Sequence, residues 1–272
     1  MTAIERWRQH LEHWAIPPEI LSAAPESPWG FPAEVFRTRG ALGADPSEPT
    51  PTTLRGLERL PEGGRVLDVG CGGGATSLPL AGRAGILIGV DAQEDMLEGF
   101  LENARAAGAD AESVQGRWPD VAARVVPVDL AVAGHVLYNV ADLEPFVQAM
   151  ADAARLRVVL ELTERHPLHW MNDLWLRFHG VERPSGPVAG DAVDALSELR
   201  LDPRIERWRA PPRPGGFARR TDAVSLVRRR LCLSPSRDDE LVGALGSRLV
   251  ERHGLWSVGP PGQELATIWF DR

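Results

Sequence analysis

The chain has 272 residues, of which 43% are hydrophobic and 25% are charged, and its net charge is −8 at pH 7. This composition is typical of a globular protein, and no apolar run approaches the roughly 18 residues that a membrane span requires. The acidic balance argues against broad binding to phosphates, so nucleic acid is not the expected partner.

Two features of the composition bear on compartment and charge. Cys71 and Cys232 are the only cysteines and cannot form a disulfide framework, and the N-terminus lacks an apolar export segment, so we expect a cytoplasmic protein. Residues 200–230 hold ten arginines, opposed by three acids (Asp202, Glu206 and Asp222). We favour a solvated arginine-rich face for this segment and keep an anion-binding surface as the alternative, for an anionic substrate.

The first fifty residues predict one helix followed by a long loop. Ile4, Trp7, Leu11 and Trp14 recur at helical spacing, which predicts an amphipathic helix that packs this stripe against the rest of the protein. The helix should stop before the prolines at 17 and 18. A proline-rich loop then runs to Thr52, and residues 53–60 suggest a short helix.

From Arg65 onward, apolar runs alternate with helical patterns. Nearly continuous apolar strands indicate a parallel sheet that helices cover on both faces, so the fold class is α/β, doubly wound with right-handed crossovers. Helices are expected at 94–107 and 142–154. The predicted strands are "RVLDVG", "GILIGVD", "AESVQ", "DLAVAG" and "RVVLEL".

The last third of the chain is harder to interpret. Its sequence predicts two strands, "RIERWR" at 204–209 and "LATIWFD" at 265–271. Between them, helical patterns occupy residues 221–231 and 237–252.

A glycine loop, "VLDVGCGGGATS", follows the first of these strands. Gly70, Gly72 and Gly74 permit a tight turn and a close approach of a ligand to the backbone, and a helix beginning near Ala75 would offer free N–H groups. Asp91 ends the next strand, 21 residues after Gly70, where a carboxylate can accept hydrogen bonds from ribose hydroxyls.

The glycine spacing alone also satisfies a dinucleotide-binding pattern. Asp68, two residues before the first glycine, distinguishes a dinucleotide site from a site for a cationic ligand. Its carboxylate should lie near the ligand, where it would repel a pyrophosphate and attract an ammonium or sulfonium group. The expected ligand is therefore cationic.

Three stretches together, "VLDVGCGGG", "GVDAQEDML" and "DLAVAGHVLYNVADLEPFV", resemble the class I S-adenosylmethionine-dependent methyltransferases over roughly residues 55–163. The resemblance implies a mostly parallel seven-stranded sheet in the order 3-2-1-4-5-7-6, with a helical N-terminal extension and helical insertions. It also implies S-adenosyl-L-methionine as cofactor. The residues implied to hold it are Asp68, Gly70, Gly72, Gly74, Asp91, Met96 beside the adenine edge, Gly134 and His135.

Two departures from this family pattern stand out. Family members often place an aspartate for the adenine amine after strand three, where this chain has Arg117 and Trp118, so backbone groups or stacking on Trp118 would have to recognise adenine. The last two strands usually form a short hairpin, and here some fifty residues separate them.

The loop after the fourth strand, "AGHVLYNV", should face the cofactor, because ligands of parallel α/β sheets bind outside the carboxyl ends of the strands. His135 should project near the transferred methyl group and is the best catalytic candidate. Tyr138 is a second candidate, although we favour a packed ring with a hydrogen-bonded hydroxyl over substrate contact. Methyl transfer requires mainly alignment and exclusion of water, and an oxygen or amine acceptor would also benefit from a base.

The region after the fifth strand supplies the remaining candidates. His166 is a candidate base, and His169 and Trp170 are candidate substrate residues; Glu161, Glu164 and His179 lie in the same stretch. Most rings of this stretch are expected to face the core, and its histidine spacing argues against a metal, so we predict none. Trp29 of "PESPWGFP" is expected to cover the pocket.

The sequence therefore predicts a methyltransferase that acts on a small molecule. Residues 1–52 would be an extension over the pocket, 53–163 the cofactor half and 164–272 the substrate half of the same domain. An RNA or protein methyltransferase using residues 200–230, a nicotinamide-dependent oxidoreductase and a non-catalytic nucleotide-binding protein stay open as alternatives. A homodimer also stays open.

Overall fold

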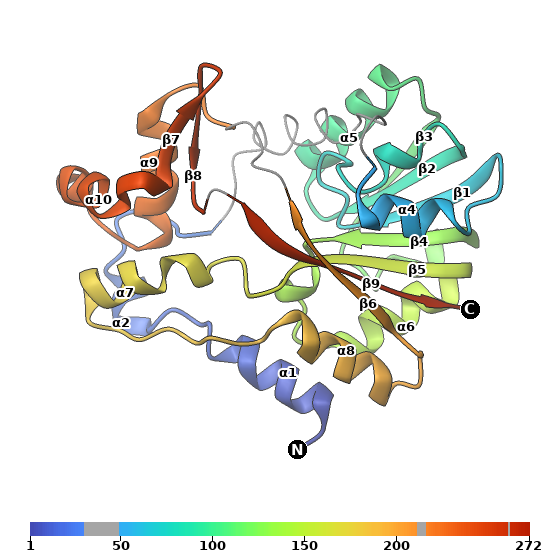
Figure 1. Ribbon diagram of the computed structural model, residues 1–272, viewed down its shortest axis with the longest axis horizontal. Coiled ribbons are helices and arrows are strands. Elements are labelled where there is room, and N and C mark those ends of the chain that lie inside the picture. Colours follow the sequence, from blue (N-terminus) through green and yellow to red (C-terminus); the bar gives the residue numbers. More distant parts are fainter. Residues whose placement is uncertain (30–48, 211–215, 261) are drawn as a thin grey trace.

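The computed structural model describes residues 1–29, 49–210, 216–260 and 262–272 (Figure 1). Its centre is a seven-stranded sheet in which β1 to β5 are parallel and β9 runs antiparallel to both of its neighbours. The predicted order 3-2-1-4-5-7-6 is confirmed, with β6 and β9 as the last two strands of the sheet. In spatial order the strands are β3 (Ala111–Gln115), β2 (Ala84–Asp91), β1 (Gly64–Val69), β4 (Val128–Gly134), β5 (Ala154–Thr163), β9 (Gln263–Asp271) and β6 (Arg204–Ala210).

Helices cover both faces of the sheet, as the continuous apolar strands predict. On β1, successive side chains point to opposite faces: Val66 joins the cluster around Phe100, and Leu67 joins the cluster around Phe146. The Phe100 face is covered by α4 (Pro51–Leu57) and α5 (Glu94–Ala106). The Phe146 face is covered by α6 (Leu143–Ala153), α8 (Ala189–Glu198) and α1 (Ala3–Glu12).

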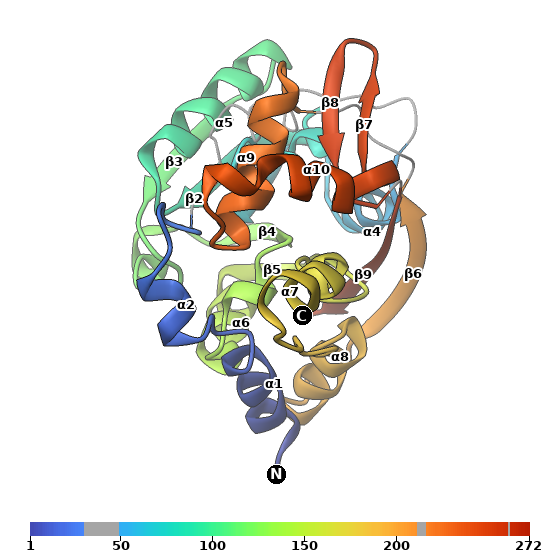
Figure 2. The same ribbon diagram turned by 90° about the vertical axis from the view of Figure 1, so that its left-hand side faces the viewer.

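The N-terminal helix packs against this body, as its apolar stripe predicts. Thr2 and Glu5 form a capping box that starts α1. Trp7 is fully buried, and its indole N–H donates to the Val140 carbonyl at 2.8 Å. Beyond the helix, the indole of Trp14 donates to the Gly186 carbonyl at 2.6 Å. In Figures 1 and 2, α1 lies beside α8 at one end of the molecule.

A second hydrophobic cluster lies outside the sheet. It joins α7 (Asn172–His179), α9 (Arg220–Arg230) and α10 (Asp238–Leu245) to the segment around α2 (Pro18–Ser22). We call this group of elements the side lobe. Figure 1 shows it on the left, facing the end of the sheet at which β5 stops and β9 starts. Among the described residues, no helix has the length and apolar character needed to cross a membrane.

Two predicted helices differ from the structure. The predicted helix 237–252 ends at Leu245, because Gly246 takes φ +51°, and the chain continues into the hairpin of β7 (Leu249–Arg252) and β8 (Leu255–Val258). The helix predicted near Ala75 is only a 3-10 turn at Leu78–Leu80. Pro79 accounts for this, because it disfavours a helical residue before it and lacks the N–H of a helix interior.

Candidate functional site

The loops after β1 and β4 approach each other closely through glycine. A Cβ on Gly70, which has φ +68°, would lie 2.6 Å from Val136 Cγ2. A Cβ on Gly134 would lie 2.0 Å from Thr76 Oγ1. Gly72 and Gly74 also have positive φ values. Gly70 therefore packs directly against Val136 and Gly134 against Thr76, and neither position has room for a side chain.

Asp91 lies at the end of β2, where the sequence predicts the ribose contact. Its carboxylate accepts the Gly72 N–H at 3.1 Å and the Gln93 N–H at 3.0 Å. These bonds use one lone pair on each oxygen and leave others for hydroxyl donors. The side chain is thus fixed against the glycine loop in an orientation that can still accept two ribose hydroxyls.

Asp68 is buried below the loop and is only 1% exposed. Its Oδ2 accepts the Ser77 hydroxyl at 2.6 Å, and its Oδ1 has no hydrogen-bond partner among the described residues. Burial raises the pKa of this carboxyl to about 7. The prediction that Asp68 lies near the ligand stays a prediction, but its buried, unpartnered oxygen fits a cofactor that brings a positive charge to this loop.

The residues predicted to contact adenine lie along the same edge of the sheet. Met96 is buried in the first turn of α5. Trp118, after β3, is partly buried, and its indole N–H donates to the Phe146 carbonyl at 3.0 Å. Arg117 is exposed. The adenine roles of these three residues stay predictions.

His135 and Glu161 form a pair at the carboxyl ends of β4 and β5. The backbone N–H of His135 donates to the Glu161 carbonyl at 2.7 Å, and its Nε2 lies 3.2 Å from Glu161 Oε1. The side chain of His135 is 38% exposed, whereas that of Glu161 is 9% exposed. His135 also has φ +61°, a conformation that costs a non-glycine residue about 1 to 2 kcal/mol. Such strain is found most often at functional sites.

A row of hydroxyl groups holds the Glu161 carboxylate from the other side. The Thr52 hydroxyl donates to Glu161 Oε2 at 2.6 Å and lies 2.7 Å from the Thr267 hydroxyl, which accepts the indole N–H of Trp208 at 3.0 Å. Because the carboxylate binds Nε2, it favours the imidazole tautomer whose lone pair is on Nδ1. The sequence pointed to Glu161 only as one of several acids, and nothing local in the sequence pointed to Thr52.

Tyr138 and His166 have packing contacts that account for their positions. The Tyr138 hydroxyl donates to the Thr163 carbonyl at 2.8 Å, its ring stacks on Trp7, and burial raises the pKa of its phenol. His166 stacks on Trp14 with 3.8 Å between ring centroids, and burial lowers the pKa of its imidazole to about 3. Such a histidine is a weak base at neutral pH. These contacts favour a structural role for both residues and leave His135 as the candidate base.

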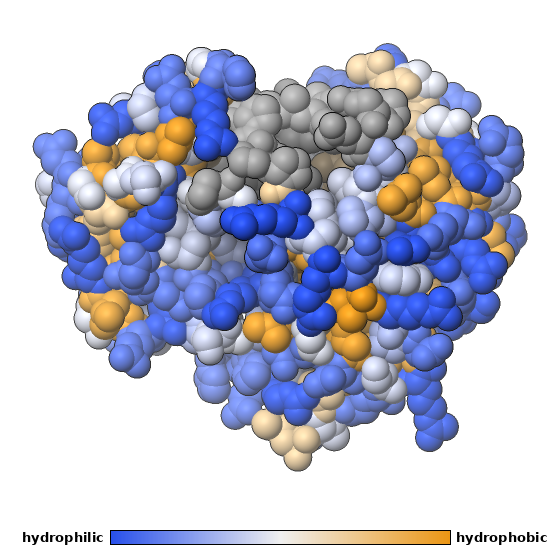
Figure 3. Space-filling view, viewed as in Figure 1, coloured by the Kyte–Doolittle hydropathy of each residue, from blue (hydrophilic) through white to orange (hydrophobic). Residues whose placement is uncertain are grey.

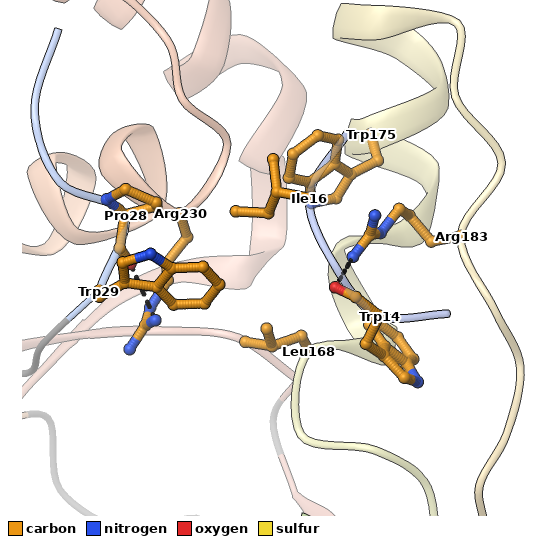
Figure 4. Close-up of a pocket in the computed structure, with 8 residues that line it drawn as sticks. All are labelled: Trp14, Ile16, Pro28, Trp29, Leu168, Trp175, Arg183 and Arg230. Atoms are coloured by element: carbon orange, nitrogen blue, oxygen red, sulfur yellow. Dashed lines mark hydrogen bonds between the residues drawn. The ribbon is translucent and has the colours of Figure 1, made fainter. Parts of the chain in front are cut away.

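Two hollows flank the segment 166–169 that follows β5. The first, a groove of about 560 Å³ including its open mouth, contains His166, His169 and Trp170 beside the start of β9. His169 Nε2 lies 3.1 Å from an Arg165 nitrogen, and burial lowers the pKa of its imidazole. Trp29 lies in the second hollow, with Trp14 and Trp175 (Figure 4). The three predicted substrate residues therefore do not line one cavity.

Four arginines of the arginine-rich segment, Arg207, Arg209, Arg219 and Arg228, pair with acids. Arg207 lies 3.0 Å from Glu164, and Arg228 lies 2.7 Å from Glu26 and 3.0 Å from Asp238. The face seen in Figure 3 is mostly hydrophilic, with its apolar residues in small separate groups. These pairs favour the interpretation of a solvated, salt-bridged face. Within the described residues, no three His, Cys, Asp or Glu side chains cluster as a metal site would require.

Comparison with known proteins finds a methyltransferase domain in this chain. The family model for a methyltransferase domain matches residues 66–156. A ubiquinone biosynthesis O-methyltransferase of Rhizobium rhizogenes is 26% identical over 178 residues, which are 58% of this chain and 70% of that protein. A relative of the same name from Rhizobium etli is 31% identical over 105 residues, 39% of this chain, and the alignment covers only 41% of that relative.

Solved structures share the fold. The YcgJ protein of Bacillus subtilis has a TM-score of 0.52 at 19% identity, covering 81% of this chain and 97% of its own. YjhP of Escherichia coli has a TM-score of 0.52 at 14% identity, covering 88% of this chain and 100% of its own. The sheet order, the glycine loop and the matched domain all point to a methyltransferase domain. Together, the matched methyltransferase domain, the relatives and the sheet order support a class I S-adenosylmethionine-dependent methyltransferase.

Proposed function

We propose that this methyltransferase methylates a hydroxyl oxygen of a small molecule, with His135 as the general base. The observation that supports this most strongly is the His135–Glu161 pair next to the glycine loop, because an imidazole held by a buried carboxylate is a common proton acceptor. An oxygen acceptor benefits from such a base, since a neutral hydroxyl is a weak nucleophile. The names of the Rhizobium relatives, which are O-methyltransferases, point the same way.

The cofactor would be held by residues on the ends of β1, β2 and β4. The glycine loop, in which Gly70, Gly72 and Gly74 take positive φ values, would hold its methionine part, and Asp91 would accept the ribose hydroxyls. Asp68 would favour its positive charge from below the loop. Gly134 allows the end of β4 to pack closely against Thr76, and Met96, Arg117 and Trp118 would surround the adenine. When bound, S-adenosylmethionine supplies a methyl group that is already activated on a positively charged sulfur.

The acceptor would enter through the groove beside β5. This groove starts at Thr163, two residues after Glu161, so it lies at the same edge of the sheet as the candidate base. His169 and Trp170 would contact the acceptor there. As the C–O bond forms and the C–S bond breaks, the hydroxyl proton would pass to Nδ1 of His135. Glu161 would stabilise the imidazolium that results.

A small acceptor suits this site better than a macromolecule. The cavity volume of the groove is about 190 Å³, which leaves room for a small acceptor. Several of the arginines that could have bound nucleic acid pair with acids instead, among them Arg207 and Arg228.

The test is to incubate the protein with methyl-labelled S-adenosylmethionine and each of three acceptor pools: small phenols and alcohols, small amines, and RNA with protein. We expect label in the hydroxyl compounds, and a loss of that label of at least about 100-fold in His135→Gln. His13→Gln, an exposed histidine outside the site, is the matched control. Transfer to amines or macromolecules without transfer to hydroxyl compounds would overturn the proposal.

A further inference from the structure

A row of hydrogen bonds runs from the edge strand β6 across β9 to Glu161 on β5. Glu161 pairs in register with Thr267 of β9, so the two side chains lie on the same face of the sheet. Thr267 accepts the indole N–H of Trp208, from β6, at 3.0 Å. On this face α4 packs against β5 and β9, and its Thr52 hydroxyl lies 2.7 Å from the Thr267 hydroxyl and 2.6 Å from Glu161 Oε2. We call Trp208, Thr267 and Thr52 the donor row.

The direction of each hydrogen bond in the donor row follows from the groups at its two ends. An indole N–H can only donate and an ionised carboxylate can only accept, whereas a hydroxyl has one proton to give. The proton of Thr52 goes to Glu161, so the Thr267 hydroxyl donates to Thr52. Thr267 in turn accepts from Trp208. Every proton of the row therefore points toward the Glu161 carboxylate.

The two hydroxyl groups of the row lie in the protein interior. Thr267 is 0% exposed and Thr52 is 4% exposed. A hydrogen bond away from water is electrostatically stronger, and removing its donor leaves the buried acceptor without a partner. Valine has nearly the shape of threonine, so packing alone does not require a hydroxyl at either position. The direction of the row and its burial both indicate a role at the carboxylate.

We propose that Thr52 and Thr267 are positioning residues for methyl transfer. They fix the Glu161 carboxylate so that its Oε1 faces His135. His135 Nε2 lies 3.2 Å from this oxygen, and Thr52 binds the other one, Oε2. With Oε2 anchored, the carboxylate is held toward the imidazole, and Nδ1 keeps the lone pair that accepts the proton. This inference rests on the proposed function of His135 and adds to it a support from α4 and β9.

The first test compares kcat in valine and serine variants of Thr52. Thr52→Val should lower kcat about tenfold, the effect of one hydrogen bond to a charged group, and leave the KM for S-adenosylmethionine within about twofold. Thr52→Ser keeps a hydroxyl and should return kcat to within about twofold of the wild type. Thr53→Val is the matched control and should leave kcat unchanged, because Thr53 is the next residue of α4, is 5% exposed and pairs with Thr50.

The second test needs no methyl acceptor. In protein with labelled histidine ring nitrogens, NMR of the neutral imidazole reports which nitrogen of His135 carries the proton, and loss of the signal in His135→Gln assigns it. The wild type should carry the proton on Nε2, and Thr52→Val and Thr267→Val should each show a mixture of both tautomers. Thr267→Val should also lower kcat at least about threefold, so the proposal can be tested even if Thr52→Val does not fold.

The outcomes separate this proposal from that of the base. A kcat within about twofold of the wild type in folded valine variants, a loss in Thr52→Val that Thr52→Ser does not restore, or a wild-type tautomer in both valine variants would each overturn the role of the donor row. A normal rate in His135→Gln would instead remove the proposed base. If no hydroxyl compound accepts a methyl group, the tautomer measurement still decides whether the row fixes the carboxylate.

Discussion

Replacing Glu161 with glutamine removes the negative charge that holds His135 while leaving a side chain of the same shape. The carboxylate lies 3.2 Å from His135 Nε2, and Glu161 is only 7% exposed. A hydrogen bond to a charged group is worth about 1.5 to 3 kcal/mol, and this bond strengthens as His135 becomes cationic in the transition state. Glu161→Gln should therefore lower kcat by about 10-fold to 150-fold.

The effect should appear in kcat and leave the KM for S-adenosylmethionine within about twofold, because Glu161 acts through His135 and is a positioning residue. The double variant with His135→Gln should be no slower than His135→Gln alone, since the two groups work as one unit. Glu144→Gln is the control, because this exposed glutamate of α6 does not line the groove. If folded Glu161→Gln protein has a kcat within about twofold of the wild type, Glu161 does not assist His135 in catalysis.

Three further predictions concern the cofactor loop and the packed tyrosine. Asp68 has a folded pKa of about 7 against an ordinary value of 3.8, so its contribution to stability is full below pH 4 and is lost as pH rises to 7. Between pH 4 and pH 8, the free energy of unfolding measured with denaturant should therefore fall by about 4 kcal/mol more in the wild type than in Asp68→Asn. An equal fall in the two proteins would contradict the burial argument. Asp91→Ala should weaken S-adenosylhomocysteine by about 100-fold in calorimetry, through loss of two charge-assisted bonds, and an unchanged Kd would remove the ribose role. Tyr138→Phe should lower the free energy of unfolding by about 1 kcal/mol with kcat nearly unchanged, and a large loss of kcat without a loss of stability would restore Tyr138 as a catalytic residue.

The cofactor half could be predicted because its signals are local in sequence. Four of its five strands contain short apolar runs, and the glycine loop and Asp91 lie directly at strand ends. The missed features depend on contacts between distant segments. Glu161 meets His135 only because Gly134 and Glu161 pair in register across β4 and β5, and Thr52 reaches Glu161 from 109 residues away.

The last third was predicted less well for the same physical reason. The hairpin of β7 and β8 interrupts a helical pattern at Gly246, and its turn places His253 and Gly254 at positive φ, which periodicity alone does not signal. Trp29 was expected to cover the pocket to which His169 and Trp170 also belong. Trp29 lies instead in the other hollow, on the opposite side of residues 166–169. Its neighbour Pro28 is held there by a hydrogen bond from Arg230 of α9.

Oxygen methylation with His135 as base is tested most directly by the single-turnover rate of His135→Gln with a hydroxyl acceptor at pH 7, measured beside its affinity for S-adenosylhomocysteine. The predicted result is a rate at least about 100-fold below the wild type with an affinity changed by less than about twofold. A single-turnover rate within about threefold of the wild type would show that the proton does not pass to His135.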